Sequence, residues 1–342
     1  MNTVRRVVAL AALAVVATAS PAAADPARPT DYRSRIDGIE PEVEGVRAEI
    51  IGGDAFIQLT VDPGLTVVVE GYNGEPYLQF LPDGTVQENQ LSPATFLNAS
   101  RYGRAGEVDM PADVAALETL DDEPEWRTVA TNGQHAWHDH RVHWMSPDKP
   151  PGFSPGDVIQ TQPVNLTVDG EPVTISVSVL LEDSISPLPW FGLGLVLLGV
   201  LVAVGWRRRS LAVAVVAALV ASVLAIIAGN GELSAVPSGA GGSALVVIVP
   251  IVALVAAVAA GILLWRGSRG LAGVCLLGSA AALGGWALLR LAVLFKPVLP
   301  TELPAGFDRA ATAVAIGAAA AVALLTFHSG AVAPAPLTDD DE

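Results

Sequence analysis

The fold is decided where residues 172–181, PVTISVSVLL, are followed by residues 190–206, WFGLGLVLLGVLVAVGW. In the first segment apolar and hydroxyl side chains alternate, which is the period-two pattern of a strand with one buried face. The second segment is an unbroken apolar run of about the length that crosses roughly 30 Å of hydrocarbon. The chain therefore passes from water into lipid between these two segments. We expect a β-domain followed by membrane helices.

Apolar runs of this kind recur through the rest of the chain. We predict transmembrane helices at residues 190–206, 211–229, 244–265, 271–295 and 310–327. Arginines follow the first run (207–209) and the third run (Arg266, Arg269), whereas residues 230–243 contain no basic residue. Because cytoplasmic loops carry the excess of Lys and Arg, we expect the segment before the first helix to be extracytoplasmic and the acidic tail, residues 328–342, to be cytoplasmic.

The apolar runs contain few polar features. Arg290 lies about a turn and a half before the outer end of its run, so we interpret it as a side chain that snorkels to the interface. Cys275 also lies within this run, which excludes an exposed thiolate, and His328 falls just beyond the last run. Small residues, with Gly278 and Gly285 among them, are expected to let helices pack closely. A block without buried charge favours an anchor or assembly platform over a pump.

The N-terminus has the pattern of a secretory signal. Residues 1–6, MNTVRR, precede a short apolar run at 7–19 and three alanines at 22–24. The run is too short to span a bilayer, and small residues of this kind mark a cleavage site. We therefore expect residues 1–24 to be a signal peptide and residues 25–187 to form an exported domain. The net charge of −16 makes the chain unsuited to nucleic-acid binding.

The sequence pattern of the exported segment, residues 25–187, indicates mainly β-strands. Short β-rich runs separated by turn residues occupy residues 46–51, 55–61, 65–72, 77–81, 85–87, 126–130, 158–168 and 172–181, with a short helix expected at 112–120. The last two runs flank Asp169-Gly170, a dipeptide that favours a tight hairpin. About seven to nine short strands in one domain are typical of a β-sandwich. We expect an immunoglobulin-like or cupredoxin-like β-sandwich followed by a five-span helical membrane domain.

Residues 134–145, QHAWHDHRVHWM, hold four of the five histidines. If residues 136–145 form one strand, His138 and His140 project from the same face about 7 Å apart and could bind Zn²⁺ or Cu²⁺ together. His135 or His143 would complete the site, although a regular strand places these two on the opposite face. Asp139 could hydrogen-bond to an imidazole and orient it, or pair with Arg141.

The same segment also has a structural interpretation. Histidine and tryptophan are compatible with strands, and a buried histidine can cross-link a sandwich core or form part of an interface. The spacing matches no standard zinc-finger or metalloprotease pattern. Copper or zinc binding and a structural or partner-facing role therefore both stay open.

Three segments, residues 70–80, residues 92–103 and residues 137–145, together resemble a family of exported actinobacterial membrane proteins that has no assigned activity. The resemblance covers mainly residues 31–181. It implies a signal peptide, a β-rich exported domain and a membrane anchor, and it implies no ligand.

Two functions follow from these features. The first is an envelope interaction, sensing or assembly protein in the lipid bilayer, without catalysis and with membrane or envelope proteins as its partners. The alternative is a membrane-anchored copper- or zinc-binding module in metal homeostasis. A hydrolase with a metal-bound water is disfavoured, because no nucleophile elbow, phosphate loop or metalloprotease helix is present.

Overall fold

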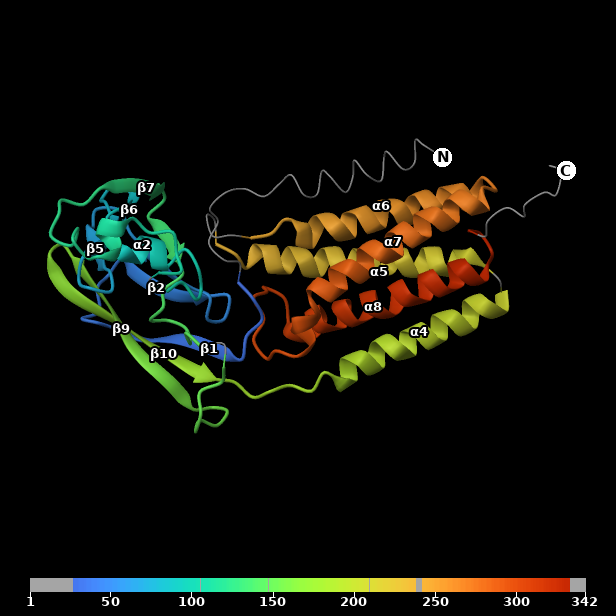
Figure 1. The fold of residues 1–342 in the computed structure, drawn as a ribbon, viewed down its shortest axis with the longest axis horizontal. Coiled ribbons are helices and arrows are strands. Elements are labelled where there is room, and N and C mark those ends of the chain that lie inside the picture. The colour runs from blue at the N-terminus through green and yellow to red at the C-terminus, as the bar shows by residue number, and fades with distance from the viewer. Residues whose placement is uncertain (1–26, 105, 147, 209, 238–241, 333–342) are drawn as a thin grey trace.

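A computed structural model describes residues 27–332, apart from residues 105, 147, 209 and 238–241. A β-sheet region, residues 32–181, is followed by a helical region, residues 188–328. We call these the β-domain and the helical bundle, and they lie end to end (Figure 1). The expected signal peptide, residues 1–24, and most of the expected tail lie outside the described residues.

The β-domain contains two antiparallel sheets. Its strands are β1 Tyr32–Glu40, β2 Val46–Ile51, β3 Phe56–Val61, β4 Val67–Glu70, β5 Pro76–Phe80, β6 Val86–Asn89, β7 Trp126–Ala130, β8 Gln134–Trp137, β9 Val158–Val168 and β10 Glu171–Leu181. Within the described residues the larger sheet has the order β1-β10-β9-β4-β5-β6-β7 and the smaller one β2-β3-β8. The predicted hairpin is confirmed, since Val168 pairs with Glu171 around Asp169 and Gly170, which both have positive φ.

Side chains from both sheets form one core. Ile57 and Leu59 of β3 are fully buried in the same apolar cluster as Leu78 of β5 and Ile175 of β10. On β10 the alternating Val173, Ile175 and Val177 produce this inward face, as the sequence pattern predicts. The predicted class, a β-sandwich followed by membrane helices, is confirmed.

Two short helices lie between β6 and β7. Helix α2, Pro93–Leu97, begins at Ser92, whose side chain accepts a hydrogen bond from the Ala94 amide. Helix α3, Ala112–Ala115, is shorter than the helix expected at 112–120. It ends before Leu117, which has a positive φ of 60° and cannot continue a right-handed helix.

The helical bundle consists of α4 Leu188–Arg208, α5 Leu211–Ser234, α6 Leu245–Trp265, α7 Arg269–Leu289 and α8 Ala305–His328. These are the five helices in the described residues that are long and apolar enough to cross a membrane, so the chain is an integral membrane protein. The fourth apolar run is not one continuous α-helix. It ends as an α-helix at Leu289 and continues as the 3₁₀ helix η1, Leu291–Leu294.

Close helix contacts lie at other glycines than those suggested by the sequence. A Cβ on Gly317 of α8 would lie 2.4 Å from the Gly194 oxygen of α4, so these two backbones touch. A Cβ added at Gly278 or Gly285 would meet nothing within 4 Å. The expected close packing at Gly278 and Gly285 is therefore wrong, because both positions face away from the neighbouring helices.

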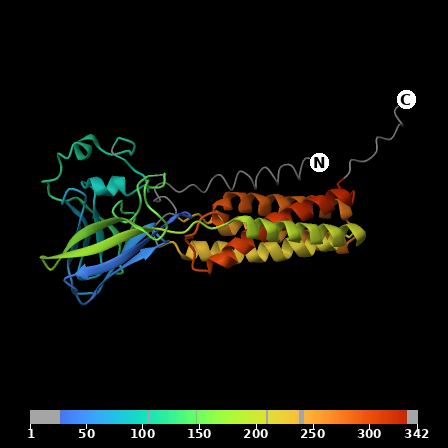
Figure 2. The same cartoon turned by 90° about the horizontal axis from the view of Figure 1, so that it is seen from below.

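The β-domain contacts the loop between η1 and α8. Thr30 and Val298 exchange backbone hydrogen bonds of 3.0 and 3.2 Å. The Lys296 ammonium donates to Asp31 at 2.6 Å. Figure 2 shows the β-domain at the same end of the helical bundle from a second direction. The loop thus ties the two parts together by main-chain and ionic contacts.

Candidate functional site

The histidine segment is not one continuous strand. Strand β8 ends at Trp137, after which the Asp139 side chain accepts a hydrogen bond from the Arg141 amide at 3.0 Å. The Val142 amide donates to the Asp139 carbonyl at 2.9 Å, which closes a turn. The strand expected over 136–145 is wrong from residue 138 onward, because an aspartate side chain that bonds nearby amides competes with strand pairing.

This turn gathers histidines that a strand would have separated. The ring centroids of His138 and His143 are 6.3 Å apart, and those of His140 and His143 are 5.5 Å apart. His138 is 1% exposed and His143 is fully buried. His135 stays on β8, where its ring stacks on Trp137 at 6.2 Å. Three of the four histidines selected from the sequence therefore form one cluster, and His135 lies outside it.

Each clustered imidazole bonds to a backbone carbonyl. His138 Nδ1 lies 2.5 Å from the Ala55 oxygen, His140 Nε2 lies 3.1 Å from the Ser100 oxygen, and His143 Nε2 lies 2.6 Å from the Arg101 oxygen. A carbonyl only accepts hydrogen bonds, so these nitrogens donate and the tautomers are set. The second nitrogen of His143, Nδ1, is buried and has no hydrogen-bond partner among the described residues.

Burial favours the neutral form of His135, His140 and His143. Burial lowers the pKa of His143 well below its ordinary value, and the Arg101 guanidinium lowers this pKa further. Burial also lowers the pKa of His140 and brings the pKa of His135 to about 4. Neutral imidazole is the form that binds metal ions, and it is also the form that burial in an apolar core requires.

The Asp139 side chain stabilises the turn through hydrogen bonds. Its carboxylate accepts hydrogen bonds from Arg141 Nε at 2.8 Å, Arg141 Nη2 at 2.7 Å and Trp137 Nε1 at 3.0 Å. Burial opposes ionisation of this carboxyl, but Arg141 nevertheless holds the pKa of Asp139 below its usual range. The pairing of Asp139 with Arg141, foreseen from their spacing, is present. The carboxylate is directed to Arg141 and Trp137.

The histidine cluster is not arranged around a metal position. Within the described residues no group of three or more His, Cys, Asp or Glu side chains is placed to hold a metal ion. His138, His140 and His143 are the residues that would supply nitrogen ligands. Because each ring donates to a carbonyl, only its second nitrogen could face a metal, and the three rings would have to turn toward a common point.

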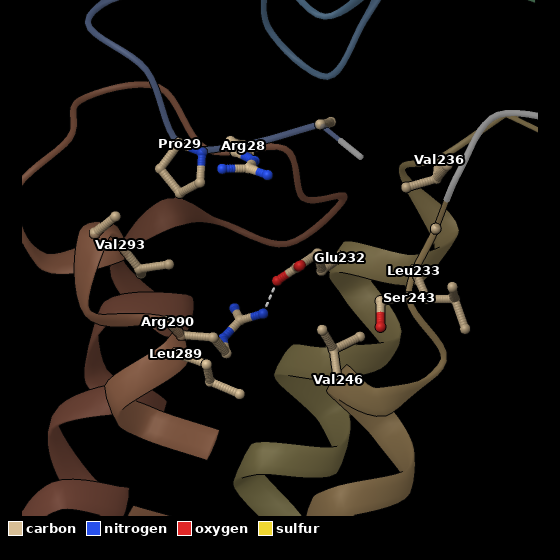
Figure 3. A pocket seen from close by; sticks show the side chains of 13 residues that line it. Arg28, Pro29, Glu232, Leu233, Val236, Ser243, Val246, Leu289, Arg290 and Val293 are labelled. Carbon is tan, nitrogen blue, oxygen red and sulfur yellow. Dashed lines mark ion pairs between the residues drawn. The ribbon is translucent and has the colours of Figure 1, made fainter. Parts of the chain in front are cut away.

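A second candidate region lies where the helical bundle meets the β-domain. A cavity of about 330 Å³ is enclosed by the ends of α5 and α7, the start of α6 and the segment before β1. Figure 3 shows Arg28, Glu232 and Arg290 around this cavity, with Glu232 and Arg290 paired. We call this space the junction cavity.

Arg290 is buried in ion pairs and does not snorkel. It is 5% exposed, and its guanidinium pairs with Asp308 of α8 and with Glu232 of α5. It also lies 4.8 Å from the Trp286 ring centroid. The expectation of a helical block without buried charge is therefore wrong. Glu232 and Asp308 fall outside the apolar runs selected from the sequence, since both lie within a turn of a helix end, and this is why the cluster was missed.

The chain matches no protein-family model, no curated protein and no solved structure. Neither region therefore inherits a role from a relative. The histidine cluster and the junction cavity have to be interpreted from their own geometry and chemistry.

Proposed function

We propose that the protein displays the β-domain outside the cytoplasm and acts in the cell envelope as an interaction, sensing or assembly protein, without catalysis of its own. The observation that carries this proposal is the difference between the two ends of the helical bundle. The β-domain lies at one end of the helical bundle, while Arg207, Arg208, Arg266 and Arg269 lie at the helix ends away from it. Arginine-rich ends of membrane helices favour the cytoplasmic side.

The interior of the β-domain supports a scaffold role. Two of its buried carboxylates are paired with arginines, Asp139 with Arg141 and Asp54 with Arg101. Arg101 also presents its carbonyl to His143, so the second ion pair and the histidine cluster are connected. Groups that are bonded in this way hold a buried turn in one conformation, which is the expected use of satisfied polar networks.

The outward face supports an interaction role. Residues 107–125 contain no Lys or Arg, and their carboxylates are exposed: Glu107, Asp109, Asp113, Glu118, Asp121, Asp122, Glu123 and Glu125. Such a segment favours a cationic partner and disfavours nucleic acid. We call this the acidic segment.

The test is site-specific photo-crosslinking in intact cells from position 116 in the acidic segment, using the full chain. We expect a discrete protein adduct that is lost in a triple variant with Asp121→Lys, Asp122→Lys and Glu123→Lys. The matched control is Glu40→Lys, Glu42→Lys and Glu44→Lys, which reverses three exposed carboxylates elsewhere. The proposal fails if no exposed position yields an adduct, or if both triple variants reduce it equally.

The second candidate function is copper or zinc binding in metal homeostasis. The observation that favours it is the buried Nδ1 of His143, which has no hydrogen-bond partner among the described residues and lies beside two further imidazoles. Titration of the full chain in detergent with Zn²⁺ and with Cu²⁺ tests this function. Stoichiometric binding that is lost in His140→Gln but kept in His135→Gln would support it. Absence of binding to the folded protein would exclude it.

A further inference from the structure

The junction cavity lies at the level where a bilayer changes from hydrocarbon to headgroups. Glu232 is within one turn of the end of α5, and Val246 is within one turn of the start of α6. Leu289 ends α7. Helix α6 has 21 residues and is therefore about 31 Å long, close to the thickness of the hydrocarbon layer. Its first turn consequently lies at the membrane boundary.

The wall of the junction cavity is amphipathic. Leu233, Val246, Leu289 and Val293 contribute apolar surface, and most of the exposed lining is apolar. Arg28, Glu232 and Arg290 contribute charge to the same space (Figure 3). A small hydrated ion would leave the apolar wall uncovered. A molecule with a charged head and a hydrocarbon chain would cover both parts.

The charged residues of the junction cavity indicate the chemistry of the charged head of this molecule. Arg290 is balanced by Glu232 and Asp308 and its side chain is buried, so its charge is already paired within the helical bundle. The exposed Arg28 has no ion pair among the described residues. The Arg28 guanidinium is therefore the group that can donate to an anion in the cavity. Arginine binds phosphate oxygens particularly well, because its planar fork places two N–H groups toward them.

We propose that the junction cavity binds one phospholipid of the surrounding leaflet, with the phosphate diester on Arg28 and the acyl chains along Val246 and Leu289. Glu232 faces the same space, so an ammonium in the headgroup would find a carboxylate there. The bound lipid fills a space between α5, α6, α7 and the segment that leads into β1. It therefore links the membrane to the β-domain.

The test is native mass spectrometry of the full chain, solubilised in detergent and supplied with phosphatidylethanolamine or phosphatidylglycerol. Wild-type protein is expected to retain one phospholipid. Arg28→Ala removes a phosphate contact, and Ser243→Phe places a bulky ring at the exposed edge of the cavity lining. Each change is expected to reduce retention about tenfold. Arg290 is left unchanged, because its ion pairs hold three helices together.

Matched controls separate this site from lipid that coats the helical bundle. Arg104→Ala removes an exposed arginine and Ser184→Phe adds a ring, and neither position lines the cavity. Both are expected to retain lipid as the wild type does. Equal retention in Arg28→Ala and Arg104→Ala would overturn the proposal. So would displacement of the lipid by inorganic phosphate alone, since the acyl chains would then contribute nothing. Arg28→Ala keeps the test decisive if Ser243→Phe fails to fold.

Discussion

At the scale of single residues, the β-domain depends on groups whose charge state is set by burial. His143 has no exposed surface and one ring nitrogen without a hydrogen-bond partner, so protonation would place a cation beside the Arg101 guanidinium. Such a cation would be both desolvated and repelled. The folded state therefore requires neutral histidines.

The first prediction concerns pH. The pKa of His135 is lowered in the folded state from 6.5 to about 4, and the pKa values of His140 and His143 are lowered as well. Below about pH 6.5 the unfolded state thus binds more protons, so stability is retained above this pH and falls as the pH decreases. Thermal unfolding of the full chain in detergent should show a lower Tm at pH 5 than at pH 7.

The matched variant is His135→Gln, which removes one titrating ring. The loss in free energy of unfolding between pH 7 and pH 5 should be smaller in this variant than in the wild type, by at most about 2 kcal/mol. Equal Tm values for the wild type at both pH values would contradict the prediction.

The second prediction concerns the buried ion pair. Asp139 is completely buried and binds Arg141 through two nitrogens. Asp139→Asn would leave the guanidinium unpaired in the protein interior, so the free energy of unfolding should fall by roughly 3–5 kcal/mol. Urea unfolding followed by tryptophan fluorescence measures this change.

The control for the ion pair is Asp62→Asn. Asp62 pairs with Arg47 through side chains that are 51% and 61% exposed. Solvent screens this pair, so its loss should leave the free energy of unfolding nearly unchanged. Similar losses in the two variants would show that the turn at Asp139 does not depend on its charge.

At the scale of elements, the bundle is organised by close backbone contacts. Helix α4 packs mainly against α8, and Gly194 and Gly317 allow their backbones to touch. Most of the remaining surface of α4 faces outward, with Leu195 and Val196 among its exposed residues. The glycine contact is therefore the point where a small change should affect the position of α4 most.

The third prediction is that Gly317→Ala destabilises the bundle by about 1–3 kcal/mol, because the added Cβ would lie 2.4 Å from the Gly194 oxygen. Thermal unfolding in detergent, followed by circular dichroism, measures the effect. Gly199→Ala on α4 is the control, since a Cβ there meets nothing within 4 Å and should leave Tm unchanged. A Tm for Gly317→Ala equal to that of the control would show that α4 is not held at this crossing.

At the scale of the whole molecule, the β-domain is attached to the bundle by more than the link into α4. The segment before β1 contacts the loop before α8 through Thr30 and Val298, and Lys296 binds Asp31. These contacts join segments that are far apart in the sequence. The position of the β-domain is thereby coupled by direct contacts to the loop that precedes α8.

The fourth prediction follows from the proposed orientation. In a Cys275→Ser background, Ala115→Cys in the β-domain should react with a membrane-impermeant maleimide on intact cells. Ser268→Cys, between α6 and α7, should react only after permeabilisation, because the loop arginines favour the cytoplasmic side for that end. Labelling of Ser268→Cys on intact cells would reverse the orientation and remove the basis of the proposed function.

Much of the architecture could be predicted from local patterns. Alternation in residues 172–181 and the Asp169-Gly170 turn predict the β9–β10 hairpin, and the apolar runs predict the membrane helices. The composition of residues 134–145 also marked the histidine segment as a candidate site, but it left metal binding and a structural or partner-facing role open. These features can be predicted because each depends only on residues that are close together in the sequence. Backbone geometry sets the alternation of a strand, and the thickness of the membrane sets the length of an apolar run.

Only the tertiary structure decided which side chains meet. The turn at Asp139 brings His143 beside His138 and His140 and leaves His135 on its strand. Three helices bring Arg290 to Glu232 and Asp308, although each residue alone resembles a polar side chain near a membrane surface. Periodicity along one helix or strand does not specify its rotation against another. Contacts between distant segments depend on that rotation and on the turns that direct the chain, so they follow from the packing of the whole molecule.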